Sequence, residues 1–152
     1  LDVHLMIENP EKYIEDFTNA GADILTFHYE AVKKENIKPL ITKIKNLGVK
    51  AGLSIKPKTQ PEEILEFLPD LDLVLVMTVE PGVGGQKFMA DCAEKIKVIK
   101  QHATQNLFIQ VDGGINAETG EICTKYGANS LVAGSYIYKA ENIKEAISSL
   151  KH

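Results

Sequence analysis

The residue best suited to proton transfer is Asp112, which ends the apolar run 107–111 and is followed by Gly113 and Gly114. A carboxylate at the end of a buried strand is desolvated, so its pKa should rise unless a cation or hydrogen bonds keep it charged. Such a group can donate or accept a proton, or bind a metal ion. Asp112 could equally cap a helix that begins near Asn116, or form an Asx turn.

Histidines lie within or at the end of two apolar runs that are candidate strands. The period of a strand places Asp2, His4 and Met6 on one face. Taken alone, His4 is more often a hydrogen-bonded core residue than a metal ligand, and the same caution applies to His28. Met6 and Met77 are interpreted as core packing.

A glycine-rich segment, Gly82-Val83-Gly84-Gly85, follows the fourth candidate strand. Glycines let a backbone approach a ligand closely. The spacing matches neither a Walker loop nor a dinucleotide-binding fingerprint. The segment therefore predicts either a loop that contacts a ligand or a flexible lid without one.

The chain has 17 basic residues, and all of them are lysines. Without arginine, a phosphate would have to be bound by backbone N–H groups or by lysine as a point charge. Gly113-Gly114 and Gly134-Ser135 follow the last two candidate strands. If these are the seventh and eighth strands of a barrel, the two pairs lie where such barrels commonly bind phosphate.

Six short apolar runs alternate with amphipathic segments, the pattern of a parallel sheet covered by helices. The predicted strands are 3–7, 23–28, 49–55, 73–78, 107–112 and 130–134, and the predicted helices are 10–19, 39–47, 61–68, 89–103, 117–126 and 143–151. No linker interrupts the series, which favours a single domain over 1–152. Periodicity alone allows an open doubly wound sheet or a (β/α)₈ barrel.

Composition excludes several classes of protein. The net charge is −4 without a basic block, which argues against nucleic acid or an anionic membrane as partner. No apolar run approaches the ~18 residues of a membrane span. Cys92 and Cys123 form no metal-binding pair and are typical of reduced thiols in a cytoplasmic protein.

Four motifs together resemble the ribulose-phosphate 3-epimerase family. They are VHLM at 3–6, MTVEPGVGGQKF at 77–88, VDGGI at 111–115 and AGS at 133–135. The resemblance implies a (β/α)₈ TIM barrel of the ribulose-phosphate-binding type, of which this chain would contain strands three to eight. The implied reaction inverts C3 of D-ribulose 5-phosphate to give D-xylulose 5-phosphate in the pentose phosphate pathway, through a metal-stabilised enediolate.

The resemblance also assigns roles to individual residues. His4 and Asp112 would bind one divalent ion (Zn, Fe, Mn or Co), and Asp112 would also be one of two catalytic acid/bases. Contacts with the sugar phosphate are implied for His4, Met6, Met77, Gly82, Val83, Gly84, Gly85, Asp112, Gly113, Gly114, Gly134 and Ser135. Family members are often dimers or hexamers, which makes a homo-oligomer a further expectation.

The family's first two strands are missing from the pattern, and with them a second aspartate, a histidine ligand and a substrate-contacting serine. Val83 also replaces a phenylalanine that members usually carry. A barrel without two adjacent strands would expose two unpaired edges and an open core. The alternatives are an inactive phosphosugar-binding or interaction fragment, and a sister allulose- or hexulose-phosphate enzyme on the same barrel.

Overall fold

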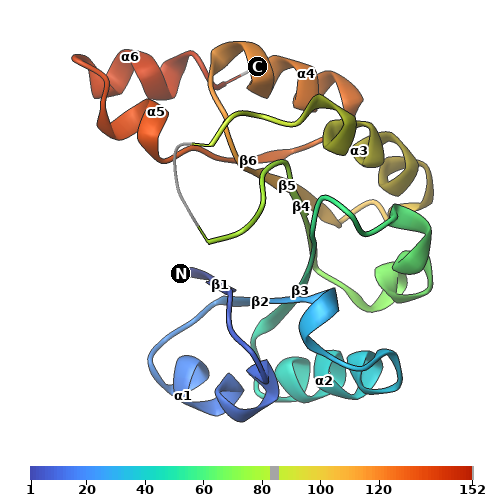
Figure 1. The fold of residues 1–152 in the computed structure, drawn as a ribbon. Coiled ribbons are helices and arrows are strands. Elements are labelled where there is room, and N and C mark those ends of the chain that lie inside the picture. Colours follow the sequence, from blue (N-terminus) through green and yellow to red (C-terminus); the bar gives the residue numbers. More distant parts are fainter. Residues whose placement is uncertain (83–85, 152) are drawn as a thin grey trace.

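A computed structural model describes residues 1–82 and 86–151 and contains one sheet of six parallel strands (Figure 1). Each strand pairs with its neighbours in chain order, so every connection leads to the adjacent strand. The strands are β1 (Asp2–Leu5), β2 (Ile24–His28), β3 (Lys50–Ile55), β4 (Leu73–Met77), β5 (Phe108–Asp112) and β6 (Ser130–Val132).

Helices follow the strands and cover the outer, convex side of the sheet (Figure 1). The α-helices are α1 (Ile14–Asn19), α2 (Lys34–Asn46), α3 (Ala90–His102), α4 (Ala117–Tyr126), α5 (Ser135–Tyr138) and α6 (Ile143–Ser148). Short 3-10 helices are η1 (Pro10–Lys12), η2 (Tyr29–Ala31), η3 (Pro61–Glu63) and η4 (Leu65–Asp70). None of the described helices is long and apolar enough to cross a membrane.

The sheet curls into a half-barrel, and a hydrogen bond across its concave face demonstrates the curvature. Gln110 Nε2 on β5 donates to Asp2 Oδ2 on β1 at 2.8 Å, although three strands separate the two in the sheet. The same amide donates to Ser130 Oγ on β6 at 3.1 Å. The barrel-type fold predicted above is therefore confirmed.

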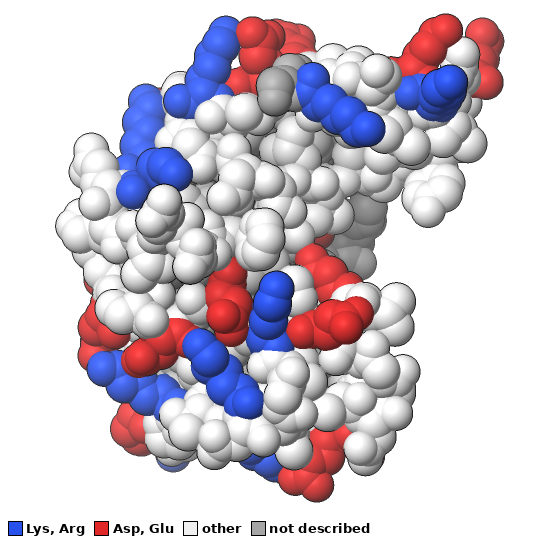
Figure 2. All heavy atoms as spheres, turned by 180° about the vertical axis from the view of Figure 1, so that it is seen from behind, with Lys and Arg blue, Asp and Glu red and all other residues white. Residues whose placement is uncertain are grey.

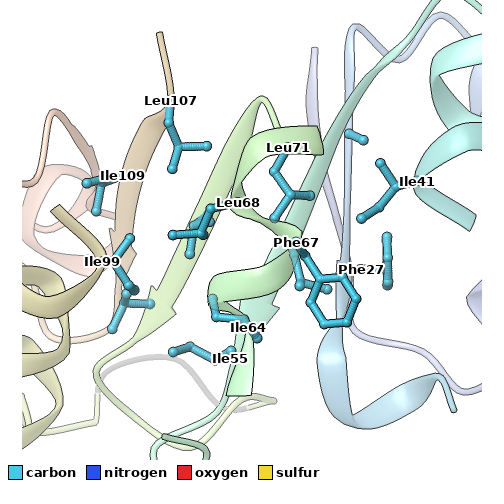
Figure 3. Close-up of a cluster of buried hydrophobic side chains, with 14 of the residues drawn as sticks. Phe27, Ile41, Ile55, Ile64, Phe67, Leu68, Leu71, Ile99, Leu107 and Ile109 are labelled. Carbon is cyan, nitrogen blue, oxygen red and sulfur yellow. The ribbon is translucent and has the colours of Figure 1, made fainter. Parts of the chain in front are cut away.

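The main hydrophobic core lies between the convex face of the sheet and the helices. Alternate side chains of each strand point to this side, as the two-residue period requires. Figure 3 shows part of this core, in which Phe27 of β2 and Ile55 of β3 lie near Phe67 and Leu68 of η4. The concave face carries a smaller apolar cluster on β4: Leu73, Leu75 and Met77, with Val79 beyond the strand.

Two helices end in the same motif before the next strand begins, as the repeated Gly-small pattern in the sequence indicates. Gly21 and Gly127 have φ of 97° and 116°, where a side chain would be strained. The N–H of the residue after each glycine donates back across the turn, from Ala22 to Phe17 and from Ala128 to Cys123. These turns return the chain tightly to the sheet.

Three predicted segments differ from the structure. Helix α2 begins at Lys34 rather than residue 39, because its buried stripe starts at Ile37 and Pro39 is accommodated inside the helix. Residues 61–68 form two 3-10 helices rather than one α-helix, since Pro69 lies in the second and provides no N–H for an α-helical bond. The short helix α5 is absent from the prediction.

Charged side chains of both signs occur across the face seen in Figure 2, in keeping with the net charge of −4. This distribution agrees with the exclusion of a basic binding surface in the sequence.

Candidate active site

The carboxyl ends of β4, β5 and β6 surround a cavity of about 250 Å³. Most residues expected to contact a ligand line it together. They are Met6, Met77, Gly82, Asp112, Gly113, Gly114, Gly134 and Ser135. Val83, Gly84 and Gly85 lie outside the described residues, and His4 lies outside this lining.

Asp112 is the half-buried carboxylate of this cavity. Its backbone is held by Thr78, whose N–H and Oγ1 both donate to the Asp112 carbonyl, at 2.9 and 3.1 Å. Burial raises the pKa of the carboxyl group. No described lysine or histidine forms an ion pair with it. The helix-cap alternative is wrong, because Asn116 itself caps α4 by accepting a hydrogen bond from Thr119 N.

The two glycines after Asp112 form a close-packed turn. Gly113 and Gly114 have φ of 128° and 64°. Thr78 Oγ1 donates to the Gly113 carbonyl at 2.6 Å. A Cβ atom on Gly114 would lie 2.6 Å from Phe88 N, so only glycine fits without a shift of backbone.

Backbone N–H groups point to the chemistry expected of this turn. Among the described residues, none accepts a hydrogen bond from the N–H of Gly114 or of Ser135. Both residues line the same cavity. Free N–H groups that converge on one space are suited to bind an anion.

His4 projects from β1 and contacts a second histidine rather than Asp112. Its Nε2 lies 2.8 Å from Nε2 of His28 on β2, and the two rings stack with centroids 4.8 Å apart. Burial, together with the neighbouring His28, lowers the pKa of His4 to about 4. The ring is therefore neutral at pH 7, the form in which imidazole binds metal ions.

The metal prediction receives only part of a donor set from the described chain. His4 offers a neutral imidazole, and Asp112 offers a carboxylate without a counter-charge, so both are suitable donor types. Residues 1–82 and 86–151 contain no group of three or more His, Cys, Asp or Glu side chains arranged to hold an ion. Two donors of this chain would thus hold one side of a metal.

The two methionines differ in their environment. Met77 is 1% exposed and packs in the apolar cluster on the concave face, as predicted. Met6 is 45% exposed and lines the cavity, so its interpretation as core packing is wrong. The strand β1 lies at the edge of the sheet, where no neighbouring strand covers this side chain.

Sequence reasoning missed Glu30, which lies beside the histidine pair. Its Oε1 accepts hydrogen bonds from Lys56 N, at 2.8 Å, and from Thr59 Oγ1. With His28 and Lys56 it lines a second cavity of about 320 Å³, which shares Met6 and Gly82 with the first. The available signal was its position, two residues after a histidine that ends a strand.

Comparisons with known proteins agree with this geometry. The model of the "Ribulose-phosphate 3 epimerase family" matches residues 1–138. A ribulose-phosphate 3-epimerase of Bacillus subtilis is 48% identical over 99% of this chain and 70% of its own length, and one of Candida glabrata is 47% identical over 99% and 60%. A rice relative, 44% identical over 99% of this chain and 67% of its own, is named a cytoplasmic isoform.

Solved structures with low sequence identity share the fold. A 3-hexulose-6-phosphate synthase from Salmonella typhimurium has a TM-score of 0.72 at 20% identity, covering 98% of this chain and 71% of the other. KGPDC from Streptococcus mutans, in complex with a sugar phosphate, has a TM-score of 0.71 at 14% identity, covering 95% and 66%.

The chain spans 60 to 70% of the length of the three curated relatives described above. The family model covers most of the chain, and the relatives' identity extends over almost all of it. This chain belongs to the ribulose-phosphate 3-epimerase family.

Proposed function

We propose that the protein acts on D-ribulose 5-phosphate and inverts its C3 to give D-xylulose 5-phosphate. The observation that carries this proposal is the position of Asp112: a half-buried carboxylate without a counter-charge, in one cavity with the N–H groups of Gly114 and Ser135. The named relatives support the choice of substrate and reaction.

The phosphate group would be bound by the backbone N–H groups at the ends of β5 and β6. These are the groups of Gly113, Gly114, Gly134 and Ser135, which need no arginine. A hydrogen bond from an N–H to a charged acceptor contributes about 1.5–3 kcal/mol, so a few converging groups suffice for micromolar binding. The sugar-phosphate complex of the S. mutans KGPDC supports a ligand of this class for the fold.

Asp112 would remove the proton from C3 of the bound ketose. Burial raises the pKa of its carboxyl group, which makes the carboxylate a stronger base than an exposed aspartate. Glu80 also lines the cavity but is exposed to solvent. Inversion requires a second acid on the opposite face, because one carboxylate alone would return the proton to the face it came from.

His4 and Asp112 would hold the divalent ion, one of Zn, Fe, Mn or Co. When bound, such an ion stabilises the negative charge that develops on the substrate oxygens, a contribution of several kcal/mol. The low pKa of His4, about 4, keeps its ring free of a competing proton. A cytoplasmic location belongs to the same proposal, supported by the name of the rice relative.

Calorimetry and a turnover assay test the proposal together. We expect ribulose 5-phosphate to bind at least tenfold more tightly than ribulose, because the phosphate is bound by backbone N–H groups. Asp112→Asn should abolish conversion to xylulose 5-phosphate and preserve binding. Equal affinity for the two sugars, or undiminished turnover by Asp112→Asn, would contradict the proposal.

A second candidate function is phosphosugar binding without turnover. It is favoured by the single half-buried carboxylate in the cavity, since inversion needs two proton-transfer groups. Binding of ribulose 5-phosphate without any exchange of its C3 proton would support this candidate.

A further inference from the structure

A chain of three side chains leads from the short helix η2 to His4. Glu30 Oε2 lies 3.4 Å from His28 Nδ1, and His28 Nε2 lies 2.8 Å from His4 Nε2. The His28 side chain is 4% exposed, so its ring nitrogens depend on protein partners. Two imidazole nitrogens in contact require one to donate a hydrogen and the other to accept it.

Glu30 is fixed in both position and charge. Its Oε1 is occupied by Lys56 N and Thr59 Oγ1, which leaves Oε2 toward His28. Burial alone would raise the pKa of Glu30, yet hydrogen bonds from His28, Thr59 and Lys56 lower it to about 2. The carboxylate is therefore ionised at neutral pH and acts only as an acceptor.

The loop that binds the Glu30 carboxylate is itself held by Lys95 of α3. Lys95 Nζ donates to the carbonyls of Lys56, Pro57 and Thr59, at 3.1, 2.7 and 2.7 Å. Lys95 is 7% exposed and forms no ion pair among the described residues. Three carbonyls on one ammonium group fix the loop, so the orientation of Glu30 is set before any ligand binds.

The contacts determine which ring nitrogens carry hydrogen. The Glu30 carboxylate faces His28 Nδ1, which has no other partner among the described atoms, so this nitrogen carries the hydrogen. His28 Nε2 is then an unprotonated acceptor and His4 Nε2 must be the donor. The remaining nitrogen of His4, Nδ1, is left with its lone pair.

We propose that Glu30 and His28 are positioning residues that fix the tautomer of His4, so that Nδ1 of His4 is the nitrogen available to an electrophile. The tautomers follow from the contacts alone. Their consequence for a divalent ion rests on the proposed function, in which His4 is one of the ligands. Partners that orient a histidine ligand typically change metal affinity by about 10- to 100-fold when removed.

The test reads the tautomers of the complete protein by nitrogen-15 NMR of its histidine rings, at about pH 8 and without metal or substrate. We expect hydrogen on Nδ1 of His28 and on Nε2 of His4. His102 is an internal reference, because its Nδ1 lies 2.9 Å from the Val98 carbonyl and must carry hydrogen. Hydrogen on Nε2 of His28, or on Nδ1 of His4, would overturn the proposal.

The role of Glu30 is tested with Glu30→Met, using the exposed Glu62→Met as the matched control. We expect the first variant to shift His28 toward the Nε2–H form, and the second to leave all tautomers unchanged. If Glu30→Met does not fold, Glu30→Gln retains one acceptor oxygen and should give a partial shift. Unchanged tautomers in the folded Glu30 variant would refute the role of the carboxylate.

Titration with Mn²⁺ alone separates this inference from the proposed function. We expect Glu30→Met to weaken Mn²⁺ binding by about 10- to 100-fold relative to Glu62→Met. The predicted tautomers together with no Mn²⁺ binding in the unaltered protein would count against the metal role of His4 and leave the positioning role intact. Altered tautomers with unchanged Mn²⁺ affinity would count against the positioning role.

Discussion

Replacing Gly114 by alanine should show how tightly the turn after β5 is packed. The cost has two parts: the backbone conformation and the space for a Cβ atom. Gly114 has φ of 64°, a left-handed conformation that costs an alanine about 1–2 kcal/mol. The lower entropy of the unfolded alanine variant returns about 0.4–1 kcal/mol of this.

Gly48 isolates the backbone part, because its φ is 80° and nothing lies within 4 Å of a Cβ built on it. We therefore expect Gly48→Ala to lower the free energy of unfolding by about 0.5–1 kcal/mol. At Gly114 the new Cβ would lie 2.6 Å from Phe88 N and 2.9 Å from Phe88 Cα. Because these are backbone atoms, relief requires the chain to move, which adds about 1–3 kcal/mol.

Urea unfolding of the two variants measures the difference, with stability read from the midpoint at an unchanged slope. Gly114→Ala should lose about 1–3 kcal/mol more than Gly48→Ala, the additional cost of overpacking. It should also bind ribulose 5-phosphate about 10- to 150-fold more weakly, if one hydrogen bond to the phosphate is lost. Equal stability losses, or an unchanged affinity, would refute the close-packed turn as a binding element.

Three further predictions concern buried charge. Lys95→Met should lower the free energy of unfolding by about 2–4 kcal/mol in urea, since three carbonyls lose their donor, whereas the exposed Lys97→Met should cost at most about 0.5 kcal/mol. The pKa of His4 falls from 6.5 to about 4 and that of Glu30 from 4.5 to about 2 on folding, so both stabilise at neutral pH and lose this as pH falls. The melting temperature should accordingly drop between about pH 6.5 and pH 2; a flat profile would be inconsistent with both shifts. The raised pKa of Asp112 has the opposite sign, because its ionisation costs stability as pH rises, so Asp112→Asn should melt at a higher temperature at pH 7 and at the same temperature near pH 3.

The strands could be predicted because each is a short, nearly continuous apolar run buried on both sides. All six predicted runs contain an observed strand, and three of the observed strands end one or two residues earlier than predicted. The differences arise at strand ends, where residues such as Thr78 leave the ladder to hold a neighbouring turn instead. Hydrophobicity does not record such a change of hydrogen-bond partner.

The glycines and Asp112 could be found in the sequence because local motifs carry them. The contacts that depend on curvature could not. Gln110 reaches Asp2 across the concave face, 108 residues away, and neither side chain belongs to a recognisable motif. Lys95 has the same property, because an isolated lysine on a helix is usually solvated, yet here it is buried under three carbonyls.

The pairing of His4 with His28 was also beyond the sequence. Each histidine was weighed alone, and only the parallel register of β1 and β2 brings their rings together. Glu30 then becomes meaningful as a third member, although its position after the strand was visible from the start.

Exchange of the C3 proton of ribulose 5-phosphate with heavy water tests the central role of Asp112 most directly. Proton removal needs Asp112 but not the second acid that inversion requires, so the measurement does not depend on net turnover. NMR should show deuterium at C3 with the unaltered protein and with the exposed control Asp16→Asn, and none above background with Asp112→Asn. Absence of deuterium with the unaltered protein, or equal incorporation by Asp112→Asn, would contradict the account.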